Sequence, residues 1–217
     1  KTILAPNLSL AFSVLISKII QQEGYKMQLL PLADNRAIEL GKKYVHNDIC
    51  YPAQINIGEA LRVIESEGFN PDNLALGLAK NCDDCRAGQY ATLARKALDE
   101  AGYPQIPIIT TGNDLKKMHP GFKLSPLFQI RMLWGLAIVD QMEAMRRKIR
   151  PYELIHGRTD QVFDSYLTRI TDALPKRISK AVAAFKDAIQ AFNAIPADRS
   201  EPKPRVGMVG EILLNYH

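Results

Sequence analysis

The first 112 residues alternate short apolar segments with longer helical ones, and no other feature constrains the fold as strongly. The apolar segments cover residues 2–5, 26–30, 74–78 and 106–110, and each has the length and character of a buried strand. Strands that alternate with helices favour parallel pairing, with helices on both faces of the sheet. We therefore predict an α/β domain over residues 1–112 with a doubly wound parallel sheet, Rossmann- or flavodoxin-like, followed by a helical extension.

The segments between these strands carry helix signals at their ends. Asp34 is a suitable N-cap, Pro52 fits the first turn of a helix, and Gly24 and Gly102 follow two helical segments as C-terminal stops. The last helix of this domain is expected over residues 86–101. In parallel sheets of this kind, ligands bind at the loops that follow the carboxyl ends of the strands.

The alternation stops after residue 112, and residues 113–204 are expected to form a helical extension that ends in a proline-rich connector. We expect one long helix over residues 125–150 and a second helical stretch over residues 160–194, with a break at Pro175. The apolar face of the first helix is expected to comprise Leu127, Ile130, Leu133, Trp134, Ala137 and Ile138.

The end of the chain is expected to return to a sheet. Residues 205–209 have the pattern of a strand, so that residues 205–217 would rejoin the sheet or open a further α/β unit. The chain begins without Met and stops just after this segment, and we interpret it as a piece of a longer protein.

Composition argues against several classes of function. The net charge of +5 lacks the pattern of nucleic-acid binders, in which basic residues gather together with aromatic ones. The one basic cluster, at residues 146–150, lies at the expected end of a helix, where cations are favourable. No apolar run approaches the roughly 18 residues of a membrane span. We therefore expect no nucleic-acid partner and no membrane. Three cysteines, an odd and low number, indicate a cytoplasmic setting rather than a secreted disulfide framework.

All three cysteines lie in two loops, each just before an expected helix. Cys50 precedes the helix that Pro52 opens, and Cys82 and Cys85 form a C-x-x-C motif directly after the third strand. A helix N-terminus offers free N–H groups and a partial positive charge, which favour the thiolate form that binds metal. If the loops meet at one edge of the sheet, the three thiols form a candidate metal or iron–sulfur site with one position open.

Four interpretations of these thiols remain open. A redox dithiol expects a thioredoxin-like setting, and the intervening Asp83 and Asp84 would oppose its thiolate. A structural zinc site needs four ligands, and His46 is the residue that would complete the three cysteines. An iron–sulfur cluster normally takes four cysteines, so three would leave one iron open to water or substrate. The fourth interpretation is three structural cysteines without a metal.

Several segments, in a fixed order along nearly the whole chain, carry a family resemblance. They are Gly41–Asp48 leading into Cys50-Tyr51-Pro52-Ala53, then Cys85-Arg86-Ala87-Gly88-Gln89-Tyr90, then Arg150-Pro151-Tyr152-Glu153 ahead of the Gly157–Asp160 turn, and Val209-Gly210-Glu211-Ile212. On these segments the chain resembles the C-terminal region of the acyl-CoA dehydratase activase-related proteins, also called CoA-substrate-specific enzyme activases. That region is similar to the subunits of 2-hydroxyacyl-CoA dehydratases.

The resemblance implies a [4Fe–4S]-type cluster held by loop cysteines. Cys50 and Cys85 match the motif best, and Cys82 is either a third ligand of this branch or a bystander. The residues expected around such a cluster are His46, Asn47 and Arg86. In the related dehydratases, a separate activase uses ATP hydrolysis to drive a low-potential electron onto the cluster, and the thioester then loses its hydroxyl as water.

The implied partners are other domains of the same longer chain, including an ATPase module, and an acyl-CoA substrate. The chain itself carries no P-loop motif, which agrees with an ATPase outside it. No side chain is assigned a catalytic role. The alternative function is a non-catalytic assembly domain with a structural zinc site or no metal.

Overall fold

The computed structural model describes residues 1–7, 9–66, 68–79, 85–111 and 121–210. The chain divides into two compact units. An α/β unit comprises residues 1–13, 24–124 and 210–217, and a helical unit comprises residues 14–23 and 125–209. Helix α1 (Leu10–Gln22) contributes to both units, because its residues up to Ser13 belong to the first and the rest to the second.

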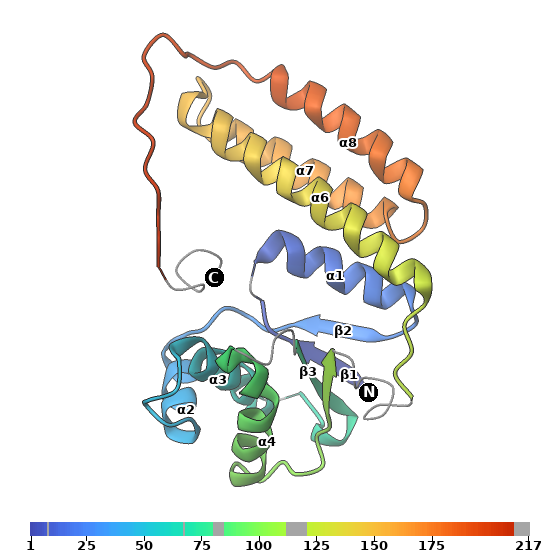
Figure 1. Cartoon of the computed structure of the whole chain (residues 1–217), viewed down its shortest axis with the longest axis vertical. Coiled ribbons are helices and arrows are strands. Elements are labelled where there is room, and N and C mark those ends of the chain that lie inside the picture. The colour runs from blue at the N-terminus through green and yellow to red at the C-terminus, as the bar shows by residue number, and fades with distance from the viewer. Residues whose placement is uncertain (8, 67, 80–84, 112–120, 211–217) are drawn as a thin grey trace. The chain divides into compact units, whose positions relative to one another are not determined.

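Among the described residues, four parallel strands form the sheet of the α/β unit in the order β2-β1-β3-β4 (Figure 1). The strands are β1 (Thr2–Ala5), β2 (Lys26–Leu29), β3 (Leu74–Ala79) and β4 (Ile108–Thr111). Thr2 of β1 is paired with Lys26 on one side and with Leu74 on the other, and Leu76 of β3 is paired with Ile108 of β4. The predicted strands and their parallel direction are therefore confirmed.

The strand order reverses its direction at the middle of the sheet. The chain passes from β1 outward to β2, and then crosses back over β1 to reach β3 and β4. Such a reversal between two neighbouring central strands is the point at which ligands bind in open α/β sheets. The observed order is compatible with the doubly wound fold that the sequence predicts.

The described helices that follow α1 in the α/β unit pack beside this sheet as one group (Figure 1). They are α2 (Asn35–Tyr44), α3 (Tyr51–Glu65) and α4 (Tyr90–Glu100), together with the 3-10 turns η1 (Pro71–Asn73) and η2 (Arg86–Gln89). The core joins Leu4 and Leu76 of the strands to Leu61 of α3 and Leu98 of α4, all of them at most 1% exposed. Each such burial stabilises the fold by roughly 1.5–3 kcal/mol.

Helices α2 and α3 contact each other backbone to backbone. A Cβ atom at Gly58 of α3 would overlap the carbonyl group of Ala37, and one at Gly41 of α2 would overlap the carbonyl group of Gln54. The start of α2 is also tied to α3, since its N-cap Asp34 accepts a bond from the Ala37 N–H and pairs with Arg62 at 2.7 Å. These contacts fix the position of α3 in the unit.

The expected helix stops are confirmed at two glycines. Gly24 and Gly102 have φ values of 91° and 88°, in the left-handed region that side chains with a Cβ rarely adopt. They end α1 and α4 respectively. The expected helix over residues 86–101 is divided, because its first turn is the 3-10 helix η2 and the α-helix starts only at Tyr90.

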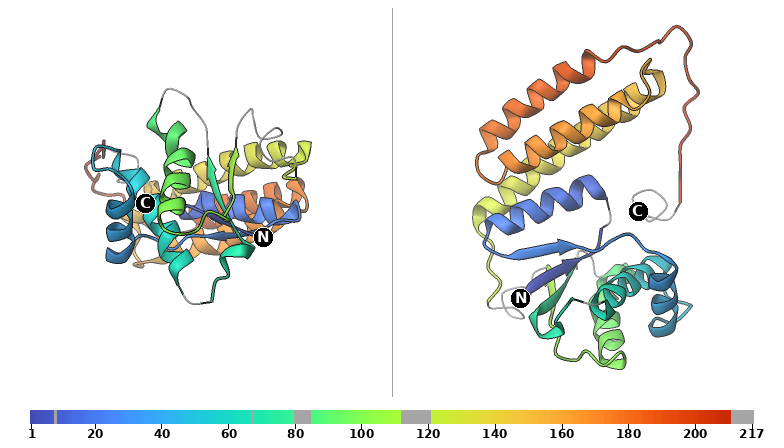
Figure 2. Two further views of the ribbon diagram at one scale, coloured as in Figure 1. Left: turned by 90° about the horizontal axis from the view of Figure 1, so that it is seen from below. Right: turned by 180° about the vertical axis from the view of Figure 1, so that it is seen from behind.

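The helical unit contains three further helices that pack pairwise (Figure 2). They are α6 (Pro126–Ile149), α7 (Arg158–Ala173) and α8 (Ile178–Asn193), and the 3-10 turn η3 (Arg150–Tyr152) follows α6. The break expected at Pro175 is confirmed between α7 and α8. In the described part of the chain, no helix is both long and apolar enough to span a membrane.

The last part of α1 packs into this helical unit around Gly135 of α6. The Cα atom of Gly135 faces the side chains of Leu15 and Leu174, and a Cβ atom at this position would come within 3 Å of both. Glu23 binds Arg131 at 3.2 Å and accepts bonds from the backbone and hydroxyl of Ser125, so the carboxylate anchors the start of α6. Both ionic side chains are largely buried.

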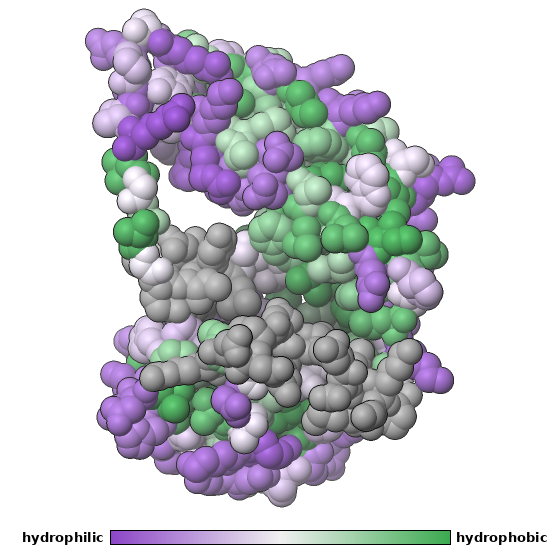
Figure 3. All heavy atoms as spheres, viewed as in Figure 1, coloured by the Kyte–Doolittle hydropathy of each residue, from purple (hydrophilic) through white to green (hydrophobic). Residues whose placement is uncertain are grey.

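The predicted apolar face of α6 is wrong in the N-terminal half of the helix. Leu127, Ile130, Leu133 and Trp134 are 45–69% exposed, whereas the buried side of the helix carries Gly135, Ile138, Val139, Met142 and Ile149. Apolar side chains accordingly gather on the surface over this half of α6 (Figure 3). The close approach of Leu15 and Leu174 to Gly135 decides which side packs inward.

The predicted strand over residues 205–209 is also wrong. Residues 202–209 adopt no helix or strand, and Val206 and Val209 are 83% and 90% exposed. A strand needs a neighbour for its backbone hydrogen bonds, and no strand of the described residues pairs with this segment.

Candidate functional site

The topology places two helix N-termini at the carboxyl edge of the parallel sheet. Helix α3 ends shortly before β3 begins, so it runs back along the sheet and its own start lies at the opposite, carboxyl edge. The chain that leaves the carboxyl end of β3 leads through η2 into α4. Both segments that carry the cysteines therefore belong to the edge where open α/β sheets bind ligands.

Cys50 is the N-cap residue of α3 and is partly buried. Its side chain makes no capping bond, and its Sγ lies instead 3.0 Å from the hydroxyl oxygen of Tyr90, the first residue of α4. Pro52 occupies the first turn of α3, as predicted. The thiol thus lies between the starts of the two helices, beside a hydroxyl that can donate to it.

Cys85 is the N-cap residue of η2 and is exposed. Its Sγ accepts a long hydrogen bond of 3.5 Å from the backbone N–H of Ala87. Backbone N–H groups that point at a sulfur stabilise negative charge on it, which is the condition for metal ligation. An exposed thiol with a backbone donor is also open to an incoming group.

The remaining predicted site residues lie in the turn before Cys50, in η2 or outside the described residues. The Nδ1 of His46 accepts the backbone N–H of Asp48 at 3.2 Å, and the His46 side chain is 75% exposed, so it stabilises the turn before Cys50. Asn47 is exposed in the same turn. Arg86 is the first residue of η2, and Cys82 lies outside the described residues.

A complete metal site is not visible in the described part of the chain. Over residues 1–7, 9–66, 68–79, 85–111 and 121–210, no three His, Cys, Asp or Glu side chains lie close enough to hold a metal ion. His46 therefore does not form a three-ligand group with Cys50 and Cys85. The structure instead adds Tyr90, which sequence reasoning did not single out as a site residue although it closes the motif that begins at Cys85.

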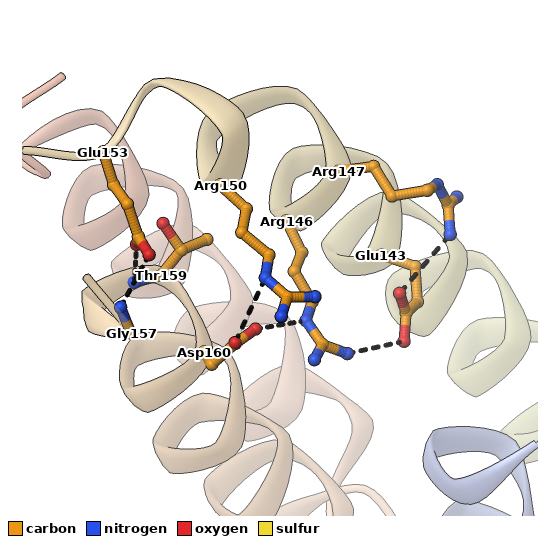
Figure 4. Close-up of polar contacts among 8 residues, drawn as sticks. All are labelled: Glu143, Arg146, Arg147, Arg150, Glu153, Gly157, Thr159 and Asp160. Atoms are coloured by element: carbon orange, nitrogen blue, oxygen red, sulfur yellow. Dashed lines mark hydrogen bonds and ion pairs between the residues drawn. The ribbon is translucent and has the colours of Figure 1, made fainter. Parts of the chain in front are cut away.

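The motif at Arg150–Glu153 contributes to the helical unit as a capping device (Figure 4). The Glu153 carboxylate accepts the backbone N–H of Gly157 at 2.6 Å and that of Thr159 at 2.7 Å, and so satisfies the first turn of α7. The Thr159 hydroxyl beside the carboxylate, then the Thr159 N–H and the Gly157 N–H, hold the pKa of Glu153 below its usual range. The hydroxyl oxygen of Thr159 is buried, and it has no hydrogen-bond partner among the described residues.

Ion pairs join the neighbouring ends of α6 and α7 (Figure 4). Asp160 binds Arg146 at 2.7 Å and Arg150 at 3.3 Å, and Glu143 binds Arg146 and Arg147 at 3.7 and 3.4 Å. The basic cluster at the end of α6 is therefore neutralised in part by acidic residues of its own unit. Together with the Glu153 cap, these bonds give the Arg150–Asp160 segment a structural role.

No family model, curated protein or solved structure matches this chain.

Proposed function

We propose that this chain is the iron–sulfur domain of a protein of the acyl-CoA dehydratase activase-related kind, acting in low-potential electron transfer or acyl-CoA dehydration. One observation carries the proposal. Cys50 and Cys85 both occupy N-cap positions, and both belong to the carboxyl edge of a parallel sheet. Both cysteines are free, and cysteine thiolates are the usual ligands of iron–sulfur clusters.

The residues present fit such a group in their chemistry. Cys50 and Cys85 would hold it, with Cys82 as the third cysteine, and the backbone donor at Ala87 and the Tyr90 hydroxyl would stabilise negative charge on the sulfurs. When bound, a [4Fe–4S] cluster supplies a low-potential electron and an iron open to substrate oxygen. The exposed position of Cys85 leaves an approach from solvent.

The sheet order suits a Rossmann- or flavodoxin-like arrangement, with the cluster at the reversal of strand order. The low cysteine count suits the reducing cytoplasm, where free thiols persist. The proposed partners are an ATPase module elsewhere in a longer chain and an acyl-CoA substrate.

A second candidate function is a non-catalytic assembly domain, with a structural zinc ion or no metal. The observation in its favour is the exposed apolar half of α6, at Leu127, Ile130, Leu133 and Trp134. Contiguous exposed apolar side chains of this kind mark interaction surfaces.

Metal analysis of the anaerobically purified chain separates the two functions. We expect about four irons and four sulfides per chain after reconstitution, with a broad visible absorption band. Cys50→Ser and Cys85→Ser should each lose most of the iron, and the matched change Cys82→Ser tests whether the third cysteine is a ligand.

Three results would count against the iron–sulfur function. Stoichiometric zinc without colour would favour the assembly domain. Retention of full iron content in both Cys50→Ser and Cys85→Ser would remove the ligand assignment. Absence of any metal after reconstitution would leave an interaction domain.

A further inference from the structure

A groove of about 440 Å³ opens on the helical unit, far along the chain from the cysteines. It lies between the start of α7 and the end of α8, and the segment that follows α8 closes one side. Val162 and Ile195 form its buried apolar floor, at 9% and 7% exposure, and the small side chains of Ala191 and Ala194 leave the space open. Its volume lies in the usual range of small-molecule sites.

Among the residues that line this groove, Arg158 is the cation, and Gln161 is the second polar side chain. Arg158, the first residue of α7, contacts only the side-chain oxygen of Gln161, at 3.4 Å, and forms no ion pair with any described acidic residue. The nearest acidic side chains along the chain are engaged elsewhere, since Glu153 caps α7 and Asp160 binds Arg146. The guanidinium group of Arg158 is therefore available to an external anion.

The chemistry of Arg158 favours a carboxylate among the possible anions. Arg158 is the first residue of the 16-residue helix α7, where Glu153 already accepts the backbone N–H groups of Gly157 and Thr159, so the guanidinium group is the donor left for a ligand. A single planar guanidinium matches a carboxylate in a bidentate pair, whereas a phosphate is normally held by several donors at once. The amide of Gln161 beside it adds one donor for a second oxygen.

We propose that this groove binds a small amphipathic carboxylate, with the carboxylate on Arg158 and the apolar body against Val162 and Ile195. The proposal goes beyond the iron–sulfur function, because the groove belongs wholly to the helical unit and uses none of the cysteines. Ile155, 58% exposed at the rim, extends the apolar wall for the ligand.

Titration of the full chain with octanoate, followed by NMR, tests the proposal. We expect saturable binding at one site, with shift changes at the start of α7 and the end of α8. Arg158→Gln should weaken octanoate binding at least tenfold and leave binding of 1-octanol unchanged. The matched change Arg205→Gln, at an exposed arginine outside the groove, should alter neither.

A second variant tests the shape of the groove without changing any charge. Ala191→Leu fills the groove and should abolish the binding of both octanoate and 1-octanol, while circular dichroism remains that of the parent chain. The proposal is overturned if octanoate does not bind, or if Arg158→Gln binds it equally well. It is also overturned if the shift changes lie on the exposed apolar half of α6 instead.

Discussion

Glu153 is the residue on which the start of α7 depends. Its two carboxylate oxygens accept the backbone N–H groups of Gly157 and Thr159, which would otherwise lack partners at the first turn of the helix. Gly157 has a φ of 82°, so the turn before the helix needs glycine. The backbone of Glu153 also pairs with Ala197 in an isolated antiparallel bridge, which ties the segment after η3 to the segment after α8.

The ionised form of Glu153 should contribute stability that depends on pH. Because folding lowers the pKa of this carboxyl below its usual value of 4.5, the folded chain binds the proton less tightly than the unfolded chain. The contribution is therefore complete above pH 4.5 and is lost as the pH falls through the lowered pKa. We expect Glu153→Gln to lower Tm at pH 7, and the deficit to shrink below pH 4.5.

Thermal unfolding followed by circular dichroism between pH 3 and pH 7 measures this deficit. Glu201→Gln, at an exposed position outside the helices, is the matched control and should leave Tm unchanged. A deficit of constant size over the whole pH range would show that the charge of Glu153 is not what stabilises α7.

At the scale of secondary-structure elements, the contact between α2 and α3 is what positions Cys50. Helix α3 is buried along nearly its whole length, and it meets α2 at Gly41 and Gly58, where no side chain separates the backbones. The thiol of Cys50 stands at the start of α3, so any shift of this helix moves the thiol relative to Tyr90.

Gly58→Ala should therefore destabilise the α/β unit. In an isolated helix, alanine would be favoured over glycine by about 1 kcal/mol. Here the added methyl group would overlap the carbonyl group of Ala37, and overpacking of this kind costs about 3 kcal/mol. The overlap outweighs the propensity, and urea unfolding should show a net loss of stability of about 2 kcal/mol.

Gly121→Ala is the matched control, because a Cβ atom there meets no atom within 4 Å. An unchanged urea midpoint for Gly58→Ala would mean that α2 and α3 can separate without cost. In that case the backbone contact would not be what holds Cys50 in place.

At the scale of the whole molecule, the chain crosses between its two units more than once. Helix α1 starts in the α/β unit and ends in the helical unit, and residues 125–209 complete the latter. Removing residues 14–23 would therefore strip the helical unit of Leu15, which packs on Gly135, and of Glu23, which binds Arg131. The helical unit is not an appendage that follows an independent domain.

The segment after α8 should be a preferred site of proteolysis. Residues 202–209 carry no regular structure and are exposed, and nicking concentrates at such segments. We expect trypsin to cleave after Arg205 before it cleaves after Arg169 in α7 or Lys186 in α8. Mass spectrometry of a short time course gives the order, and earlier cleavage within α7 or α8 would contradict the structure of the helical unit.

Local patterns in the sequence determined the elements that depend on neighbours along the chain. The alternation of apolar segments predicted β1 to β4 and their parallel direction, and Asp34, Gly24 and Gly102 marked helix ends that the structure confirms. For the candidate site, the sequence predicted the positions of Cys50 and Cys85 just before helices, at the carboxyl edge of the sheet. It assigned no role to Tyr90, since Cys50 and Tyr90 are 40 residues apart in the chain.

Only the tertiary structure decided which surfaces pack. Leu127, Ile130, Leu133 and Trp134 form a regular apolar stripe, yet Gly135 sets the buried side of α6, because only a residue without a Cβ allows the approach of Leu15 and Leu174. The apolar pattern at residues 205–209 formed no strand, because a strand exists only where a neighbour accepts its backbone hydrogen bonds. Periodicity reports the propensity of a segment, whereas burial depends on what the rest of the chain brings against it.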